Sequence, residues 1–174
     1  MNLKEITIDG KVYDLVPREE ATPQTQKTGY ERAERDGKYF LEWACCKEAD
    51  SDEDEYDEYG NTAFKNAGYY TNEKLANDNI RADRLLRRLR RFSAVNRKNK
   101  IDWKNSNQMK FHIIFDYKEE EINVVGRSVI RHFGGIYFDT KELAAKAIEE
   151  FRDDLMWYFT KYKDIAEEPA EDDD

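Results

Sequence analysis

The 174-residue chain contains only two histidines, two cysteines and three prolines, and it lacks a long apolar run. No stretch approaches the ~20 consecutive apolar residues that a bilayer span needs, and no charged-then-apolar leader opens the sequence. These absences predict a protein without a membrane segment, located in the cytoplasm.

The two cysteines, Cys45 and Cys46, are neighbours in the sequence. A disulfide between adjacent residues requires a strained backbone, so the pair is more simply interpreted as two reduced thiols of a cytosolic protein. Neither cysteine has a partner at the spacing of a zinc site. We therefore expect no structural zinc and no redox role.

The sequence also lacks the motifs of the common catalytic classes. It has no glycine-rich phosphate loop and no nucleophile elbow, and its two histidines, His112 and His132, stand in expected strands. Carboxylates are abundant, but their spacing does not single out a catalytic pair. We expect a protein that is not an enzyme, uses no cofactor and acts by binding.

Charge is plentiful and unevenly distributed. Charged residues make up 39% of the chain, as do hydrophobic ones, and the formal net charge is −9. Between Arg81 and Lys100, however, nine basic residues accompany one acidic residue, Asp83. The sequence thus describes a cationic element within an anionic body.

Hydrophobic periodicity predicts an α+β fold in which antiparallel β-hairpins pack against two amphipathic helices. An Asp9-Gly10 turn indicates a hairpin over 5–16. The helices are expected near 72–96 and 139–162, the second opened by a capping box starting at Asp139. Further strands are expected at 38–46, 64–70, 109–117, 122–133 and 136–138.

Residues 68–76 are similar to residues 136–144, which suggests two ββα-like halves. Tyr69 aligns with Tyr137, and Leu75 with Leu143. The halves would form either one mixed core or two packed lobes. The chain accordingly divides into an N-terminal hairpin and linker (1–28), a first unit (29–100), a second unit (101–165) and a disordered acidic tail (166–174).

The first candidate site is an acidic segment at 48–58, expected to be a loop. Its opening resembles a calcium loop, but Glu55 and Asn61 stand where an EF-hand needs glycine and a bidentate glutamate. The remaining interpretations are a solvated loop or a mimic of nucleic-acid phosphates that binds a cationic groove. The candidate residues are Asp50, Asp52, Glu53, Asp54, Glu55, Tyr56, Asp57, Glu58 and Tyr59.

The second candidate site is an arginine row on the first long helix, flanking its apolar stripe. Three interpretations are open: a solvated face that pairs with the protein's own carboxylates, a set of phosphate contacts, or a surface for an acidic partner. The row consists of Arg81, Arg84, Arg88 and Arg91, and Arg87, which points further round the helix, is included among the candidate residues.

Several segments of the sequence resemble those of small acidic accessory proteins of bacteriophages and prophages of Gram-positive bacteria. They are Thr28–Arg32 followed by Lys38-Tyr39-Phe40, Asn66–Ala76 leading to Arg87–Phe92, and Ile136–Ala144. This resemblance implies a protein that counters host defence, as anti-CRISPR proteins do. The leading hypothesis is a non-enzymatic inhibitor of a defence nuclease such as a Cas effector, acting in the host bacterial cytoplasm. The alternative is a nucleic-acid-binding accessory protein that uses the basic helix at 81–100.

Overall fold

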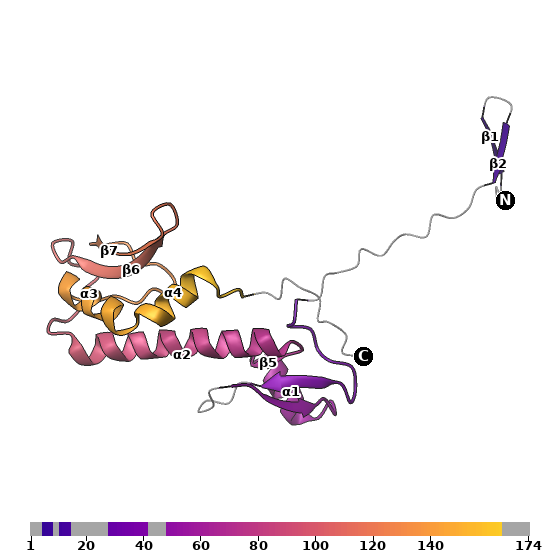
Figure 1. Cartoon of the computed structure of the whole chain (residues 1–174), viewed down its shortest axis with the longest axis horizontal. Helices are drawn as coiled ribbons and strands as arrows, with labels where there is room; N and C mark the ends of the chain where they lie inside the picture. Colours follow the sequence, from indigo (N-terminus) through magenta and orange to yellow (C-terminus); the bar gives the residue numbers. More distant parts are fainter. Residues whose placement is uncertain (1–4, 9–10, 15–27, 42–47, 165–174) are drawn as a thin grey trace.

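The computed structural model describes residues 5–8, 11–14, 28–41 and 48–164, and it confirms a small α+β fold with antiparallel sheets (Figure 1). The strands are β1 (Glu5–Ile8), β2 (Lys11–Asp14), β3 (Lys38–Leu41), β4 (Asp50–Glu53), β5 (Tyr69–Tyr70), β6 (Lys110–Asp116) and β7 (Glu121–Arg127). The helices are α1 (Glu58–Lys65), α2 (Glu73–Asn96), α3 (Lys141–Glu150) and α4 (Arg152–Thr160).

Strands β1 and β2 form the predicted N-terminal hairpin, with Ile6 opposite Tyr13 and Thr7 opposite Val12. The Asp9-Gly10 turn lies outside the described residues, as do Cys45, Cys46, the expected acidic tail and nearly all of the expected linker.

The first half of the fold is a three-stranded sheet in the order β4-β3-β5, together with α1. In β3, Phe40 lies opposite Ser51 of β4 on one side and Tyr70 of β5 on the other. Phe40 and Tyr70 are buried against the start of α2, where they pack with Leu75 and Ala76. The sheet is therefore held on the first turns of this helix.

The second half consists of the β6–β7 hairpin, α3 and α4. Phe111 of β6 exchanges two backbone hydrogen bonds with Phe138, at 2.9 and 2.8 Å, so a short third strand is present as a single bridge. The core beneath the hairpin contains Leu85, Leu89, Phe138, Leu143, Ala144, Ala147, Phe151 and Leu155.

Helix α2 is shared by both halves. In Figure 1 it runs through the middle of the molecule, with β3, β5 and α1 at its N-terminal end and α3, α4 and the β6–β7 hairpin along the rest. Leu75 and Ala76 belong to the first core, and Leu85 and Leu89 to the second. The two cores thus meet within α2, and not at the predicted unit boundary after residue 100.

The segments 68–76 and 136–144 occupy equivalent positions in the two halves. Each supplies a short strand and then a helix. Asn72 caps α2 by accepting a hydrogen bond from the Leu75 backbone N–H at 2.8 Å, and Thr140 caps α3 by accepting one from Leu143 at 3.1 Å. Leu75 and Leu143 are both buried. The sequence similarity therefore corresponds to a repeated ββ-hairpin, short strand and helix.

Two predictions about the second long helix are corrected. The N-cap is Thr140 and not Asp139, because the Asp139 carboxylate instead accepts hydrogen bonds from the backbone N–H groups of Lys98 and Asn99, at 2.9 and 2.8 Å. The helix does not run unbroken over 139–162. It breaks at Phe151, whose φ of −113° and ψ of 20° are not helical and whose ring is buried against Phe92.

Several predicted strands are shorter than expected. The strand predicted at 64–70 is limited to β5, because Phe64 belongs to α1. The return strand predicted at 122–133 ends at Arg127. Residues 42–47 of the strand expected at 38–46 lie outside the described part of the chain.

Candidate functional site

The acidic segment at 48–58 is a loop only in part, because Asp50–Glu53 form a strand and Glu58 begins a helix, while 54–57 lie in neither. Its first part forms β4, an edge strand that pairs with β3. Its last residue begins α1, which Asp57 caps by accepting a hydrogen bond from the Gly60 N–H at 2.7 Å. Strand pairing and helix capping therefore fix the backbone that carries these carboxylates.

Asp54 anchors this segment from the inside. Its carboxylate is fully buried and accepts two hydrogen bonds from the Arg32 guanidinium, at 2.7 and 2.8 Å. It also accepts bonds from the Tyr69 hydroxyl and the Tyr56 backbone N–H, both at 2.9 Å. Arg32 in turn donates to Asn61 of α1 and stacks on the Tyr56 ring, 4.4 Å from its centroid. Asp54 is thus a structural residue and does not belong to an exposed binding surface.

The hydrogen bonds to Asp54 shift its own pKa and that of Tyr69. The bonds from Arg32 lower the pKa of Asp54 to about 2, against the opposing effect of burial. Burial raises the pKa of Tyr69 to about 12, and the carboxylate of Asp54 adds to this rise. The carboxylate is therefore ionised throughout the neutral range and the Tyr69 hydroxyl remains a donor.

The other carboxylates form an exposed acidic surface, defined here by six side chains. They are Asp50, Asp52 and Glu53 of β4, Glu55 and Asp57 of the following turn, and Glu58 of α1. Tyr56 and Tyr59 lie exposed among them. Within the described residues none of the six carboxylates takes part in an ion pair.

The carboxylates of this acidic surface help to raise the pKa values of two tyrosines, Tyr59 and Tyr39. Burial, and then the charges of Asp52, Asp50 and Asp57, raise the pKa of Tyr59. Burial, and then charges that include those of Asp52 and Asp57, raise the pKa of Tyr39 to about 12. These carboxylates follow one another closely along the chain from Asp50 to Glu58, so they create a concentrated negative potential.

A charged edge strand also prevents sheets from pairing edge to edge. All four residues of β4 are exposed, so this protection is present. The acidic surface extends beyond the strand, however, through Glu55 and Asp57 to Glu58 of the helix. Protection of the edge alone does not account for that extension.

The arginine row divides into a structural part and an exposed part. Arg81 and Arg88 both bond to the carboxylate of Asp154 in α4, at 3.1 and 2.9 Å. Arg81 also lies over Trp157, 4.0 Å from the ring centroid, and Arg88 over Phe151 at 4.7 Å. These two arginines hold α4 on α2.

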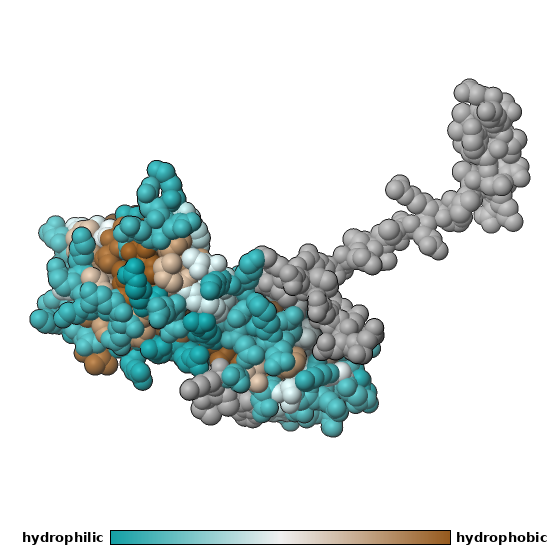
Figure 2. All heavy atoms as spheres, viewed as in Figure 1, coloured by the Kyte–Doolittle hydropathy of each residue, from teal (hydrophilic) through white to brown (hydrophobic). Residues whose placement is uncertain are grey.

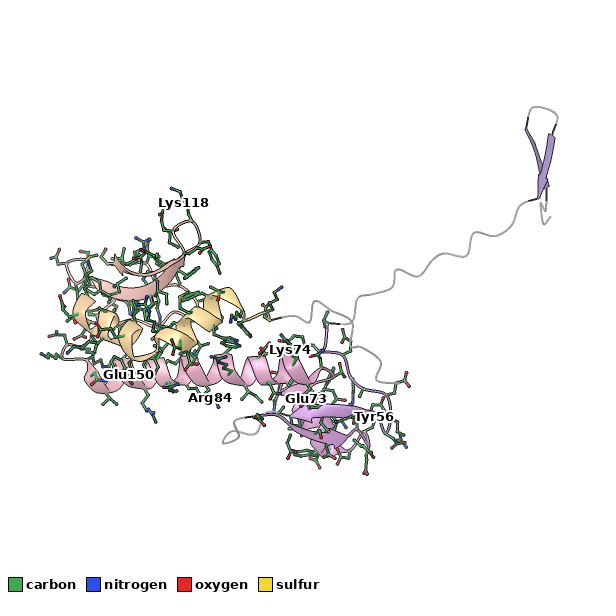
Figure 3. All side chains as sticks on the ribbon, viewed as in Figure 1. Tyr56, Glu73, Lys74, Arg84, Lys118 and Glu150 are labelled. Atoms are coloured by element: carbon green, nitrogen blue, oxygen red, sulfur yellow. The ribbon has the colours of Figure 1, made fainter. Side chains whose placement is uncertain are left out.

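The remaining candidate arginines of α2 are Arg84, Arg87 and Arg91. Arg84 is half-buried and is labelled along the middle of the helix in Figure 3, while Arg87 and Arg91 are exposed. The structure therefore brings the nine acidic-segment candidates together around β4 and α1, but it uses part of the arginine row for packing.

The two histidines lie together in the second half. Their ring centroids are 5.5 Å apart, and that of Tyr137 lies 5.3 Å from His112. The Nδ1 atom of His112 is buried without a hydrogen-bond partner in the described structure. Burial and the neighbouring charges of His132 and Arg127 lower the pKa of His112.

The described residues offer neither an assembled metal site nor a membrane helix. Where side chains are placed, no three histidine, cysteine or acidic groups gather as metal ligands. None of the helices in the described ranges is both long enough and apolar enough to cross a bilayer.

Sequence reasoning missed Arg32 as the residue that positions the acidic segment. Arg32 and Asp54 are 22 residues apart and belong to no local motif, so no periodicity or capping signal connects them. A comparison of the chain with protein-family models, curated proteins and solved structures found no match.

Proposed function

We propose that the protein is a non-enzymatic inhibitor of a bacterial defence nuclease, such as a Cas effector, in the cytoplasm of a phage-infected cell. The acidic surface would bind the cationic groove in which the nuclease holds nucleic acid. The observation that carries the proposal is the rigid display of six exposed carboxylates that make no ion pairs within the described residues.

The contrast with the arginine row supports this choice of surface. A nucleic-acid-binding helix would present its arginines to phosphates, yet Arg81 and Arg88 are bonded to Asp154 within the protein. The net charge of −9 also opposes the approach of a polyanion to the body of the molecule. Both facts favour a cationic partner for the acidic surface.

The test is a target-cleavage assay with purified Cas effectors and their guide RNAs, with and without the protein. A first variant replaces all six carboxylates of the acidic surface by their amides. Asp57→Asn retains a capping oxygen, so α1 is preserved. We expect this variant to lose inhibition, chiefly through slower association, because exposed charges steer the encounter of two proteins.

A matched control separates local charge from net charge. It replaces six exposed glutamates of the second half by glutamine, namely Glu119, Glu120, Glu121, Glu142, Glu149 and Glu150. The same charge is removed, but inhibition should persist. Inhibition by the unmodified protein should weaken as salt rises. Equal loss in both variants, or loss on Arg84→Gln with Arg91→Gln, would refute the proposed surface.

A further inference from the structure

Two segments of the second half form one continuous surface, the basic-aromatic surface, made of the exposed side chains at 97–104 and 127–133. The buried ammonium of Lys110 donates to the backbone carbonyls of Asn105, the residue after the first segment, at 2.8 Å and of Ser128 in the second at 2.6 Å. The guanidinium of Arg131 lies 5.8 Å from the ring centroid of Trp103. The two segments are therefore neighbours in space.

This surface has the opposite charge to the rest of the molecule. The sequence from 97 to 104 contains four basic residues and one acidic residue, Asp102. From Ile122 to Phe138 there is no acidic residue, whereas Arg127 and Arg131 are both exposed. The two segments thus carry a net positive charge in a chain of net charge −9.

The second segment also carries exposed apolar side chains. Phe133 is 108% exposed, and Val129 and Ile130 are more than half exposed. Figure 2 shows apolar side chains gathered over the β6–β7 hairpin, while the rest of this view is mainly hydrophilic. Exposed apolar side chains that lie close together are a common feature of interaction sites.

A cleft of about 350 Å³ adjoins this ring. It is lined by Phe133, His132, His112 and Tyr137, with Leu86 and Tyr158 on its other side. Its size is within the usual range for a small planar ligand. His112 contributes the buried Nδ1 atom that has no hydrogen-bond partner among the described residues.

We propose that single-stranded nucleic acid binds this basic-aromatic surface. Arg127 and Arg131 would contact phosphates, and a base would stack on Phe133 with its edge at the cleft beside His112. A duplex hides its base faces, and a lipid acyl chain carries no group that could bond to His112, so a single strand fits best. This inference goes beyond the proposed function and does not depend on it.

The test measures fluorescence anisotropy of labelled oligo(dT) and oligo(U), each about 20 nucleotides long by design, at low salt without any nuclease. We expect Phe133→Ala to weaken binding roughly 5- to 150-fold, since each base stacked on an aromatic ring contributes on that scale. Phe133→Trp should retain binding. Phe133→Leu keeps the apolar character but lacks the ring face, and should weaken binding as alanine does.

Arg127→Gln with Arg131→Gln should weaken binding and lower its salt dependence, by about 0.7 in the logarithmic slope for each phosphate that is no longer neutralised. Arg84→Gln with Arg91→Gln removes the same charge elsewhere and should have little effect. The inference is overturned by absence of binding to both oligonucleotides, by full binding of Phe133→Leu, or by equal loss in the two arginine pairs. Phe133-dependent sedimentation with phosphatidylserine vesicles, without oligonucleotide binding, would also overturn it.

Because these measurements contain no nuclease, their outcome is separate from that of the cleavage assay. Apart from Arg84, which is half-buried, the substituted side chains are exposed, and melting monitored by circular dichroism should show each variant folded. Loss of binding in a folded Phe133→Ala protein can then only reflect the surface.

Discussion

The two halves of the molecule share one frame, namely a hairpin, a short aromatic strand and a capped helix, but they differ in the charged side chains attached to it. In each half a hairpin strand pairs with a short aromatic strand, Tyr69–Tyr70 in the first and the bridge at Phe138 in the second. A capped helix follows in both. The frame therefore specifies the fold, while the edges and turns attached to it are free to carry different charges.

The buried charge of each half illustrates this difference. Phe40 pairs with Tyr70 in the first half, and Phe111 pairs with Phe138 in the second. The residue before each phenylalanine is buried, and it is the uncharged Tyr39 in the first half but the charged Lys110 in the second. The first half stabilises its outer edge with the Asp54 carboxylate held by Arg32, and the second uses the Lys110 ammonium held by two carbonyls. Carboxylates flank Asp54 in the chain, whereas Arg127 and Arg131 lie on either side of Ser128, which accepts a hydrogen bond from Lys110.

The largest effect is expected from the core of the second half. Phe151→Ala should lower the free energy of unfolding by about 3–5 kcal/mol, and Leu89→Ala by about 2–5 kcal/mol, because both side chains are buried. Urea denaturation followed by circular dichroism measures both values. Losses below about 1 kcal/mol would contradict the assigned core.

In the first half, Asp54→Ala should cost about 3 kcal/mol, since it leaves the Arg32 guanidinium and the Tyr69 hydroxyl without their acceptor. The same denaturation assay applies. Arg32→Lys is a useful companion, because a lysine cannot reproduce the two-point bond to the carboxylate. A wild-type stability for Asp54→Ala would show that the buried pair is not the anchor of the acidic segment.

This pair also predicts a dependence on pH. The pKa of Asp54 is lowered from 3.8 to about 2 in the folded state. Its contribution is therefore complete above the unfolded pKa and is lost as the pH falls through the folded value. Unfolding curves between about pH 5 and about pH 2 should show a smaller decline for Asp54→Asn than for the unmodified protein.

Gly60→Ala should destabilise the protein by about 1–3 kcal/mol, although the same change within a helix is ordinarily favourable. A Cβ atom at this position would lie 2.9 Å from the Asp54 carboxylate oxygen. Thermal melting gives the sign directly. A raised melting temperature would mean that α1 can move away from Asp54 at little cost.

The smallest effect concerns the two equivalent caps. Asn72→Ala and Thr140→Ala should each cost about 1 kcal/mol, because each removes one hydrogen bond to a helix N-terminus. Asn72→Asp and Thr140→Ser keep the accepting oxygen and serve as controls. Strongly unequal losses would show that the second frame is not equivalent to the first.

The long helix was predictable because its apolar stripe and its N-cap lie within a few residues of one another. The repeat was visible for the same reason, since Tyr69 and Leu75 recur as Tyr137 and Leu143 at identical spacing. The cap at Asp139 was predicted wrongly because the competing donors, Lys98 and Asn99, lie 41 and 40 residues away in sequence.

The candidate surfaces were only partly predictable. Composition located the acidic segment, but it could not separate the buried Asp54 from its exposed neighbours, since burial follows from the distant Arg32. Likewise, the sequence located the arginine row on α2. It could not tell which arginines pack on α4, because that depends on Asp154, which lies 66 residues beyond Arg88 in the chain. Local patterns cannot report such contacts.

Helix α2 separates the acidic surface from the basic segment at 97–104. The first half packs on its first turns, and the basic segment at 97–104 follows its last residue. With 24 residues at about 1.5 Å each, α2 spans roughly 36 Å, several times the ~8 Å Debye length of physiological salt. At this separation the acidic surface and the basic segment at 97–104 screen one another little, so within the described residues they act on a partner as two distinct charged surfaces. A charged partner would therefore turn the protein into one orientation before the two surfaces touch.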